Sequence, residues 1–432
     1  MKTRTMIVVV VLFSLVAAAP LFAGGKQEAA APAEEKHTIV FWMHDSPQTT
    51  AFIKDQMIPE YESKNPGIQI ENQFVPHKDY EVKLITALTG GIGPHAYDIG
   101  DWLIQAYQEK GLLDSINYKA FGFSSLQSLE KAWWPSSLGG FKMKGGIYGI
   151  PMEYNTFSLF VNREHFSEIG LDAAADYPKT WRELGEIGSK LVKKDSNGRF
   201  TREAFDWPYL GSVWTLLTLE PLINQNRGNV VNSDGSPNID SKEVIDALAT
   251  YKGLIWEYGT GDPAVGISSG TNPNADFNAG DLSMWITGPW AQPLITDMHG
   301  KYDVVPLPQT EGGKESTILY AWAWVVNGMA EDKNKEKAWH WLNFLSSNQV
   351  GFLTECGYLQ PRIGWEDTKE FKEFPFMQVF YDDMANGKFM FRSNKWAELG
   401  EIMDRAVQKA VKSNEDPEKV LKAAQAEAEK IM

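Results

Sequence analysis

Short apolar runs alternate with amphipathic stretches along residues 37–102. Three runs have the length and the β-branched or aromatic content of strands: 37–42, 68–75 and 97–102. Two stretches between them show helical spacing of apolar residues: 48–63 and 79–89. The second stretch runs into the glycines at 90–91, which favour the end of a helix. Strands that alternate with helices predict βαβ units and a mostly parallel sheet.

The pattern is sharpest at residues 275–293, where an apolar run directly precedes Gly288-Pro289-Trp290. The run, residues 282–287, predicts a strand. Gly288 ends it, and Pro289 suits the first turn of a helix, where the missing N–H costs nothing. Trp290 is therefore expected at a strand-to-helix junction, the place where α/β proteins bind small ligands. The structural alternative is a core residue, because Trp is buried on average.

Further along the chain, Thr180 and Glu183 have the spacing of a capping box, which predicts a helix from residue 181. The pattern of apolar residues predicts further helices at 241–258 and 333–349, one or two helices over 397–432, and a strand at 302–308.

The amino-terminal residues 1–23 have the pattern of a secretory signal, with cleavage expected after Ala23. The apolar run within the signal is too short to span a membrane. Residues 24–37 contain much Ala, Glu and Pro, which predicts a disordered tether. The single cysteine, Cys356, leaves no intramolecular disulfide and no cysteine near the signal to carry a lipid. We therefore expect a periplasmic protein, secreted across the inner membrane without a lipid anchor.

Composition narrows the classes of function. A net charge of −15 argues against nucleic acid as a partner. The 16 Trp, 15 Tyr and 22 Phe fit a core, but aromatic side chains also line sites that hold half-apolar ligands. The seven histidines show no metal-ligand spacing, and the chain has no GxSxG, HExxH, CxxC or P-loop motif. We expect no metal, no other cofactor and no catalysis.

Nine landmarks occur in a fixed order along the chain: TIVFW at 38–42, NPGI at 65–68, LITALTGG at 84–91, YGIP at 148–151, KTWREL at 179–184, FNAG at 277–280, GPW at 288–290, PLP at 306–308, and AW at 338–339 leading to Leu345. In this order and spacing the chain resembles the extracellular (periplasmic) solute-binding proteins of ABC importers. The likeness is to the sugar-binding group that includes maltose-binding protein, and it runs from about residue 38 to the end.

The resemblance implies an α/β, two-lobed periplasmic-binding-protein fold (type II). Each lobe would be a mostly parallel sheet flanked by helices, with the ligand cleft at the hinge. The expected crossings lie near 149–153, 300–304 and 356–362. The expected lobes are residues 38–149 with 303–356, and residues 150–302 with 357–432. Ligand binding would close the lobes, and the closed monomer would dock on the membrane-embedded ABC permease subunits.

A sugar has apolar faces and polar edges, so its site needs aromatic plates and hydrogen-bonding groups. Such residues are expected just after strands. Three sets of candidates lie there: Trp42, His44 and Asp45; Asp101 and Trp102; Glu153 and Tyr154. The first two sets have structural alternatives, with Trp42 in the core, His44 in solvent or Asp101 as a helix N-cap.

Four more candidates come from the resemblance and from spacing. The family places an aromatic ligand plate at the Gly-Pro-Trp motif, which makes Trp290 the leading candidate, and relatives often place an arginine at the last hinge, here Arg362. Trp322 and Trp324 alternate with alanines, so both rings should point to one face and one could line the cleft. Many relatives are glycine-rich at 320–324, so the bulky residues here are a departure from the family pattern.

The expected function is capture of a carbohydrate, a mono- or oligosaccharide, and its delivery to the permease. The same role for a polyol, an amine or a peptide stays open. For a cationic ligand, Asp45, Asp101 and Glu153 could surround the charge beside aromatic rings. A secreted glycoside hydrolase is the weaker alternative; it needs two carboxylates at a set separation, and acidic residues are plentiful here.

Overall fold

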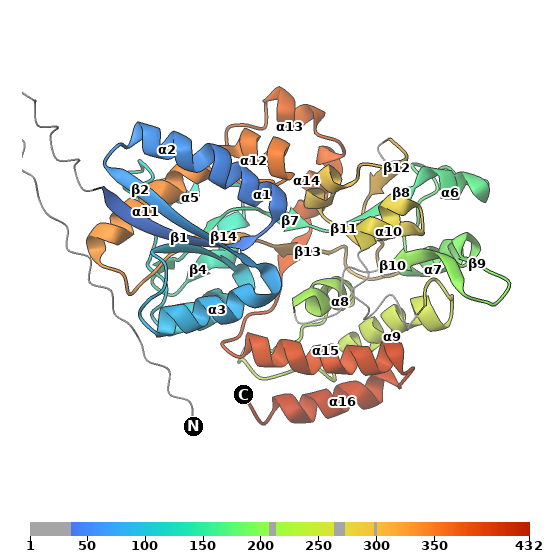
Figure 1. Ribbon diagram of the computed structural model, residues 1–432. Helices are drawn as coiled ribbons and strands as arrows, with labels where there is room; N and C mark the ends of the chain where they lie inside the picture. Colours follow the sequence, from blue (N-terminus) through green and yellow to red (C-terminus); the bar gives the residue numbers. More distant parts are fainter. Residues whose placement is uncertain (1–35, 207–212, 263–272, 298–299) are drawn as a thin grey trace, which may run out of the picture. The chain divides into compact units, whose positions relative to one another are not determined.

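The computed structural model describes residues 36–206, 213–262, 273–297 and 300–432 (Figure 1). The expected signal peptide, 1–23, lies outside the described residues, as does the expected tether, 24–37, except for its last two residues. The described residues all belong to one unit, Lys36–Met432.

The first sheet has five strands in the order β2-β1-β3-β14-β6. They are β1 (His37–Asp45), β2 (Ile68–Pro76), β3 (Ala96–Gly100), β6 (Ile150–Pro151) and β14 (Trp322–Val326). The three strands expected near the amino terminus are therefore confirmed, and β1 pairs in parallel with both β2 and β3. β14 joins antiparallel, with Trp322 opposite Gly100 and Trp324 opposite Asp98. The carboxyl ends of β1 and β3 thus lie at the same end of the sheet, next to the first residue of β14.

The helix expected at 48–63 forms as α1 (Pro47–Phe52) and α2 (Ile58–Lys64), joined by a π-helical turn, Ile53–Met57. Its expected apolar face is buried, as shown by Phe52, Met57 and Tyr61. The next helix, α3 (His77–Thr89), begins two residues earlier than expected and ends at Gly90. α3 contacts both β1 and β2, which places its first turn beside the carboxyl ends of those strands.

The second sheet has the order β12-β8-β11-β10-β9. Its strands are β8 (Ser158–Asn162), β9 (Lys193–Lys194), β10 (Phe200–Asp206), β11 (Leu282–Thr287) and β12 (Tyr302–Val305). The strand expected at 282–287 is confirmed as β11, which is buried along its whole length and pairs with β8 and β10. Only the β10–β11 pairing is parallel, so this sheet is mixed rather than mostly parallel as expected.

The return of the chain to the first sheet comes later than expected. The expected boundary at residue 303 falls inside β12, and β12 pairs with β8 of the second sheet through Tyr302–Val305. A third, three-stranded sheet lies on the chain's path between the other two, with the order β15-β13-β7. Its strands are β7 (Asn155–Thr156), β13 (Thr317–Tyr320) and β15 (Gly387–Phe389). β7 lies between β6 and β8 in the chain and β13 between β12 and β14, so we call this the crossing sheet.

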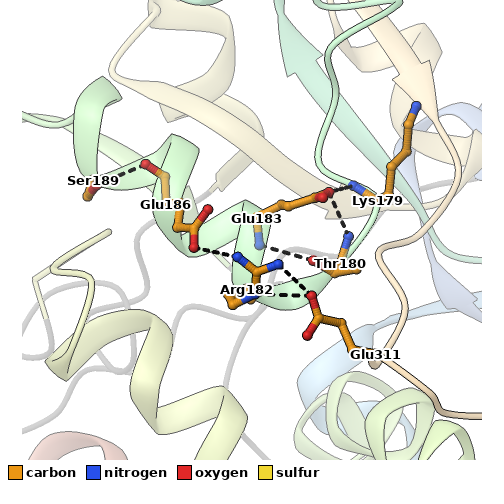
Figure 2. Close-up of polar contacts among 7 residues, drawn as sticks. All are labelled: Lys179, Thr180, Arg182, Glu183, Glu186, Ser189 and Glu311. Carbon is orange, nitrogen blue, oxygen red and sulfur yellow. Dashed lines mark hydrogen bonds and ion pairs between the residues drawn. The ribbon is translucent and has the colours of Figure 1, made fainter.

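The capping box expected at Thr180 and Glu183 is confirmed at the start of α7 (Trp181–Leu191). The Glu183 backbone N–H donates to the Thr180 hydroxyl at 3.1 Å, and the Glu183 carboxylate accepts from the Thr180 N–H at 3.3 Å (Figure 2). Arg182 extends the same turn, because its guanidinium bonds to Glu186 within the helix and to Glu311 in the loop before β13 (Figure 2). An exposed ion pair thus joins the first turn of α7 to that loop.

Four helices pack on one another beside the second sheet: α8 (Val213–Gln225), α9 (Lys242–Trp256), α15 (Trp396–Lys412) and α16 (Pro417–Ala428) (Figure 1). The remaining helices are α4 (Ile104–Glu109), α5 (Leu126–Glu130), α6 (Arg163–Glu168), α10 (Pro273–Ala279), α11 (Asp332–Ser346), α12 (Gln349–Cys356), α13 (Lys369–Glu373) and α14 (Met377–Ala385). A two-stranded hairpin, β4 (Lys142–Met143) with β5 (Gly146–Ile147), completes the strands. Among the described residues, no helix combines the length and the apolarity needed to cross a membrane.

Candidate ligand-binding site

The site begins with a buried pair, His44 near the end of β1 and Asp98 in β3. The Asp98 carboxylate accepts from the His44 backbone N–H at 3.1 Å, and its second oxygen bonds to His44 Nδ1. Burial alone would lower the pKa of His44, but the charge and the hydrogen bond of Asp98 outweigh it and raise the pKa above its usual value. The pair therefore holds a positively polarised imidazole at the strand end, while it leaves the other ring nitrogen, Nε2, outside that bond.

Aromatic rings gather on His44. The Trp322 ring lies 4.2 Å from the imidazole, centroid to centroid, and the His77 ring lies at 5.4 Å. Trp102 packs edge-on against Trp322 at 5.2 Å. Burial, together with the nearby charge of His44, lowers the pKa of His77 to about 4, so His77 is neutral at physiological pH. Thus His44, Trp102 and Trp322, each expected from the sequence as a ligand contact, come together in one aromatic group.

Asp101 follows β3 directly and lies fully buried in a 3₁₀ turn, Asp101–Leu103. One carboxylate oxygen accepts from the Ala321 backbone N–H at 3.0 Å, and the other accepts from the Arg392 guanidinium at 3.2 Å. Burial raises the pKa of Asp101 to about 6, although the charge of Arg392 opposes this rise. Both carboxylate oxygens of Asp101 thus accept hydrogen bonds from the protein, and the Arg392 guanidinium pairs with its charge.

Glu153 differs from Asp98 and Asp101, because no basic side chain forms an ion pair with it among the described residues. It lies between β6 and β7 and is only 4% exposed. Burial raises the pKa of Glu153 to about 7, while the nearby Asn155 amide and the charge of His44 oppose the rise. Asn155 is fully buried, and within the described part of the chain neither of its amide atoms has a hydrogen-bond partner. The Asn155 amide therefore offers unused hydrogen-bonding capacity in a buried position, close to the Glu153 carboxyl.

Trp290 occupies the expected junction after β11, although a 3₁₀ turn, Pro289–Leu294, stands there in place of an α-helix. Its ring lies 5.4 Å from Tyr320 and 5.9 Å from Phe157 and remains partly exposed. A Cβ atom at Gly288 would meet this ring at 1.6 Å, so the indole takes this position only because residue 288 is glycine. Burial and the charge of Glu153 raise the pKa of Tyr320, and the Tyr320 ring also contacts Trp290.

The other expected site residues lie at the margin of this group or outside it. Asp45 is exposed and accepts from the Thr50 hydroxyl at 2.7 Å, and Trp42 is half-buried with the Lys83 ammonium over its ring at 5.4 Å. The Tyr154 ring packs against Trp134 and Phe389. Two candidates are held elsewhere, because Trp324 is fully buried against Phe352 and Arg362 bonds to Asn343 and Ser347 of the α11 region.

Sequence reasoning missed Asp98, Arg392, Glu220 and Tyr320. The sequence did contain a signal that Glu220 is unusual, because it is the single charged residue in the apolar sequence of α8. It is buried, accepts from the Phe391 N–H at 3.2 Å, and has its pKa raised by burial to about 8. Asp98 could have been noticed in the same way, because it is a carboxylate inside a short buried strand. No sequence signal pointed to Arg392, since it is 291 positions away from its partner Asp101 in the sequence.

The arrangement suits binding of an uncharged ligand with several hydroxyl groups. The Trp322 ring packs on His44, the Trp290 ring packs on Tyr320, and the buried Asn155 opposite Tyr320 has amide atoms without a hydrogen-bond partner among the described residues. Among the described residues, no cluster of three metal-ligating side chains occurs. The fold and this site define a two-lobed binding protein, built from two α/β sheets joined by crossing strands.

The chain belongs to the family of bacterial extracellular solute-binding proteins, whose model matches residues 46–351. It is 25% identical over 385 residues to a putative binding protein of Brucella abortus. This match covers 86% of this chain and 88% of that protein. Its structure resembles an ABC substrate-binding protein from Listeria monocytogenes in complex with cycloalternan, with a TM-score of 0.79, 22% identity and coverage of 92% and 99% of the two chains. A solute-binding protein from Thermotoga lettingae, bound with α-D-tagatose, gives a TM-score of 0.78, 23% identity and coverage of 91% and 99%.

Proposed function

We propose that this protein is the extracytoplasmic substrate-binding component of an ABC importer, and that it captures a carbohydrate and delivers it to the membrane permease. One observation carries the proposal: both amide atoms of the buried Asn155 have no hydrogen-bond partner among the described residues, and Asn155 lies opposite Tyr320, whose ring packs against Trp290. Buried polar groups are almost always satisfied, so unused ones in such a place favour a ligand that satisfies them. The Listeria and Thermotoga proteins, whose fold this chain shares, were solved with carbohydrates bound.

A sugar fits this chemistry in detail. Its C–H faces can pack on the indole rings of Trp322 and Trp290, and its hydroxyl groups can reach Glu153 and Asn155. One carboxylate accepts from two neighbouring hydroxyls, and such charge-assisted hydrogen bonds are stronger than neutral ones. The rings would then supply apolar contact, and the polar groups would fix the orientation of the sugar.

A cationic ligand is less well supported. A cage of carboxylates needs uncompensated charge, yet Asp101 is paired with Arg392 and Asp98 with His44. Asp45 is exposed and bonds to Thr50. Glu153 is left as the single carboxylate of the group without a basic partner among the described residues. A polyol remains the closest alternative to a sugar, since it offers the same hydroxyl groups without a ring.

The proposal includes export and mode of action. Residues 1–23 would direct secretion and be removed, and the mature protein would act as a free monomer in the periplasm. The sheets would close about the crossing sheet when ligand binds, as in other hinge-type binding proteins. The proposed role is binding without chemical change of the sugar.

Titration of the purified protein with mono- and oligosaccharides, polyols, amines and peptides tests the function. We expect the tryptophan fluorescence to change on addition of a sugar, because Trp102, Trp290 and Trp322 lie in the proposed site. Isothermal calorimetry on the same ligand should give a dissociation constant at or below the micromolar range, about −8 kcal/mol. Responses to amines or peptides alone would refute the carbohydrate proposal, and release of hydrolysed sugar would show an enzyme instead.

Affinity for the sugar should depend on pH through Glu153. Its pKa of about 7 lies far above the usual 4.5, so the carboxyl loses its charge as the pH falls through neutrality. The ionised form accepts more hydrogen bonds from hydroxyl groups, so affinity should be highest at pH 8 and above and fall by up to about tenfold between pH 8 and pH 6. Calorimetry at these two pH values measures the change. The Glu153→Gln variant should bind more weakly, with a flat profile; a profile as steep as the wild type would assign the effect to His44.

A further inference from the structure

A cavity of about 200 Å³ is lined by the second half of α8, by residues 229–232 after it, and by β15 with the residues that follow. Its polar lining residues are Glu220, Asn224, Asn229, Asn232, Lys388 and Arg392. Glu220 and Asn224 are buried, whereas Lys388 is exposed, so the lining runs from buried polar groups to the surface. Liquid water takes up about 30 Å³ per molecule, which leaves room here for several waters or one small ligand.

Lys388 brings a positive charge to this cavity. Its ammonium donates to the side-chain oxygens of Asn224 at 2.9 Å and Asn229 at 2.7 Å, and it forms no ion pair with a described residue. An ammonium has three N–H donors, so one is left over. The other basic residue of the lining, Arg392, is paired with Asp101. Lys388 thus keeps both its charge and one donor available.

Asn224 adds a buried donor. Because an ammonium can only donate, its bond from Lys388 identifies which end of the Asn224 amide is the oxygen. The amide nitrogen, Nδ2, is buried and has no hydrogen-bond partner among the described residues. Buried polar atoms are almost always bonded to protein, water or ligand. Since Asn224 is only 5% exposed and lines the cavity, the partner of this nitrogen would have to come from within the cavity.

Glu220 is the acidic residue of the lining, and burial keeps it mostly neutral. Its carboxyl accepts from the Phe391 backbone N–H at 3.2 Å. Burial raises the pKa of Glu220 to about 8; the Phe391 N–H and the charge of Lys388 oppose this rise, and the charge of Asp101 adds to it. At pH 7 the carboxyl is therefore mostly protonated, and a protonated carboxyl donates a hydrogen bond. At this pH, Glu220 can donate to an anion rather than repel it.

We infer that this cavity is a second ligand site, for a small tetrahedral oxyanion such as sulfate or phosphate. The oxygens of sulfate only accept, and the lining offers donors from an ammonium, an amide and a carboxyl hydroxyl. A hydrogen bond from a charged donor to an anion is also stronger than a neutral one. The inference goes beyond the proposed sugar binding and does not rest on it, because none of the three donors is among the residues proposed to hold the sugar.

Calorimetry with sodium sulfate, phosphate and acetate tests the site without sugar, at an ionic strength held constant with chloride. We expect one sulfate or phosphate per chain, with a dissociation constant of about 1 mM or below. Acetate should bind more weakly, because it has two oxygens for three donors. Lys388→Gln should weaken sulfate binding at least about fivefold, because it removes the charge-assisted hydrogen bond.

The matched control is Lys252→Gln. Lys252 also donates to two oxygens, the backbone carbonyls of Asn414 at 3.1 Å and Glu415 at 2.9 Å, but it lies on α9 and does not line the cavity. This variant should bind sulfate as the wild type does.

Sulfate is the probe for pH dependence, because it does not titrate between pH 7 and pH 9. Glu220 becomes charged as the pH rises through about 8, so the affinity of the wild type should fall by up to about tenfold between these two values. Glu220→Gln cannot ionise and keeps a donor. It should therefore bind sulfate about as tightly as the wild type at pH 7 and lose little affinity at pH 9.

Several results would overturn the site. No response to sulfate or phosphate would mean that water alone fills the cavity. Sulfate binding that Lys388→Gln leaves intact, in a variant shown to be folded by circular dichroism, would place the ion elsewhere on the protein. Tighter binding of acetate than of sulfate would assign the cavity to carboxylates. A loss at pH 9 that is as steep in Glu220→Gln as in the wild type would remove Glu220 from the site.

Discussion

Replacing His44 with alanine should lower the free energy of unfolding by about 3–5 kcal/mol, because it removes one partner of a buried charged pair. Asp98 is fully buried, and in the His44→Ala variant one of its carboxylate oxygens would lose its hydrogen-bond donor. Urea unfolding followed by circular dichroism measures the loss. The effect is large because the remaining carboxylate cannot reach water and must keep its charge at a cost or take up a proton.

The double variant His44→Ala/Asp98→Asn is the control for this pair. It should lose less stability than the sum of the two single variants, since neither partner then stays charged without the other. The contribution of the pair should also depend on pH. The pKa of His44 is raised above its usual 6.5, so the stabilisation is fully present below pH 6.5 and is lost as the pH rises through the folded-state pKa. Strictly additive losses, or a difference between wild type and His44→Ala that grows at high pH, would contradict the pairing.

The Trp290→Ala variant should bind the sugar about 1–3 kcal/mol more weakly, a loss of roughly fivefold or more. The ring is partly exposed, packs on Tyr320 and Phe157, and thus presents a flat apolar surface next to the buried polar groups. Truncation should cost less stability than affinity, because the exposed part of the ring adds little to folding. Calorimetry on the best-binding sugar of the panel measures the change.

Trp256 provides a matched control for Trp290. Its side chain is 42% exposed on α9, and its indole N–H donates to the Val411 carbonyl at 2.6 Å, away from the proposed site. The Trp256→Ala variant should bind sugar as the wild type does. An affinity of Trp290→Ala equal to that of the wild type would show that Trp290 is a packing residue, the structural alternative that the sequence left open.

The sequence predicted best what is decided locally. The strand at 282–287, the junction at Gly288 and the capping box at Thr180 are all confirmed, because each depends on neighbours within a few residues. Two of the expected aromatic contacts, Trp102 and Trp322, also lie together, since they flank the same edge of the first sheet.

What the sequence could not predict depends on distant pairing. The boundary expected at residue 303 falls inside β12, which pairs with β8 of the second sheet, and no local pattern encodes that pairing. The two tryptophans at 322 and 324 share a strand and spacing, yet only Trp322 joins the rings on His44, because α12 places Phe352 on Trp324. The partnership of Asp101 with Arg392 depends on tertiary contacts between remote segments.

The crossing sheet has a mechanical consequence. Asn155 and Tyr320 lie opposite each other in β7 and β13, so residues proposed to read the ligand form part of the very strands that lead from one sheet to the other. Points near a pivot travel least when two bodies rotate about it. In the proposed closure these residues would therefore keep their geometry throughout, and a ligand could engage them before the sheets move. A small rotation at the crossing sheet would then produce a much larger displacement at the parts of the two lobes farthest from it, where a permease could recognise the closed form.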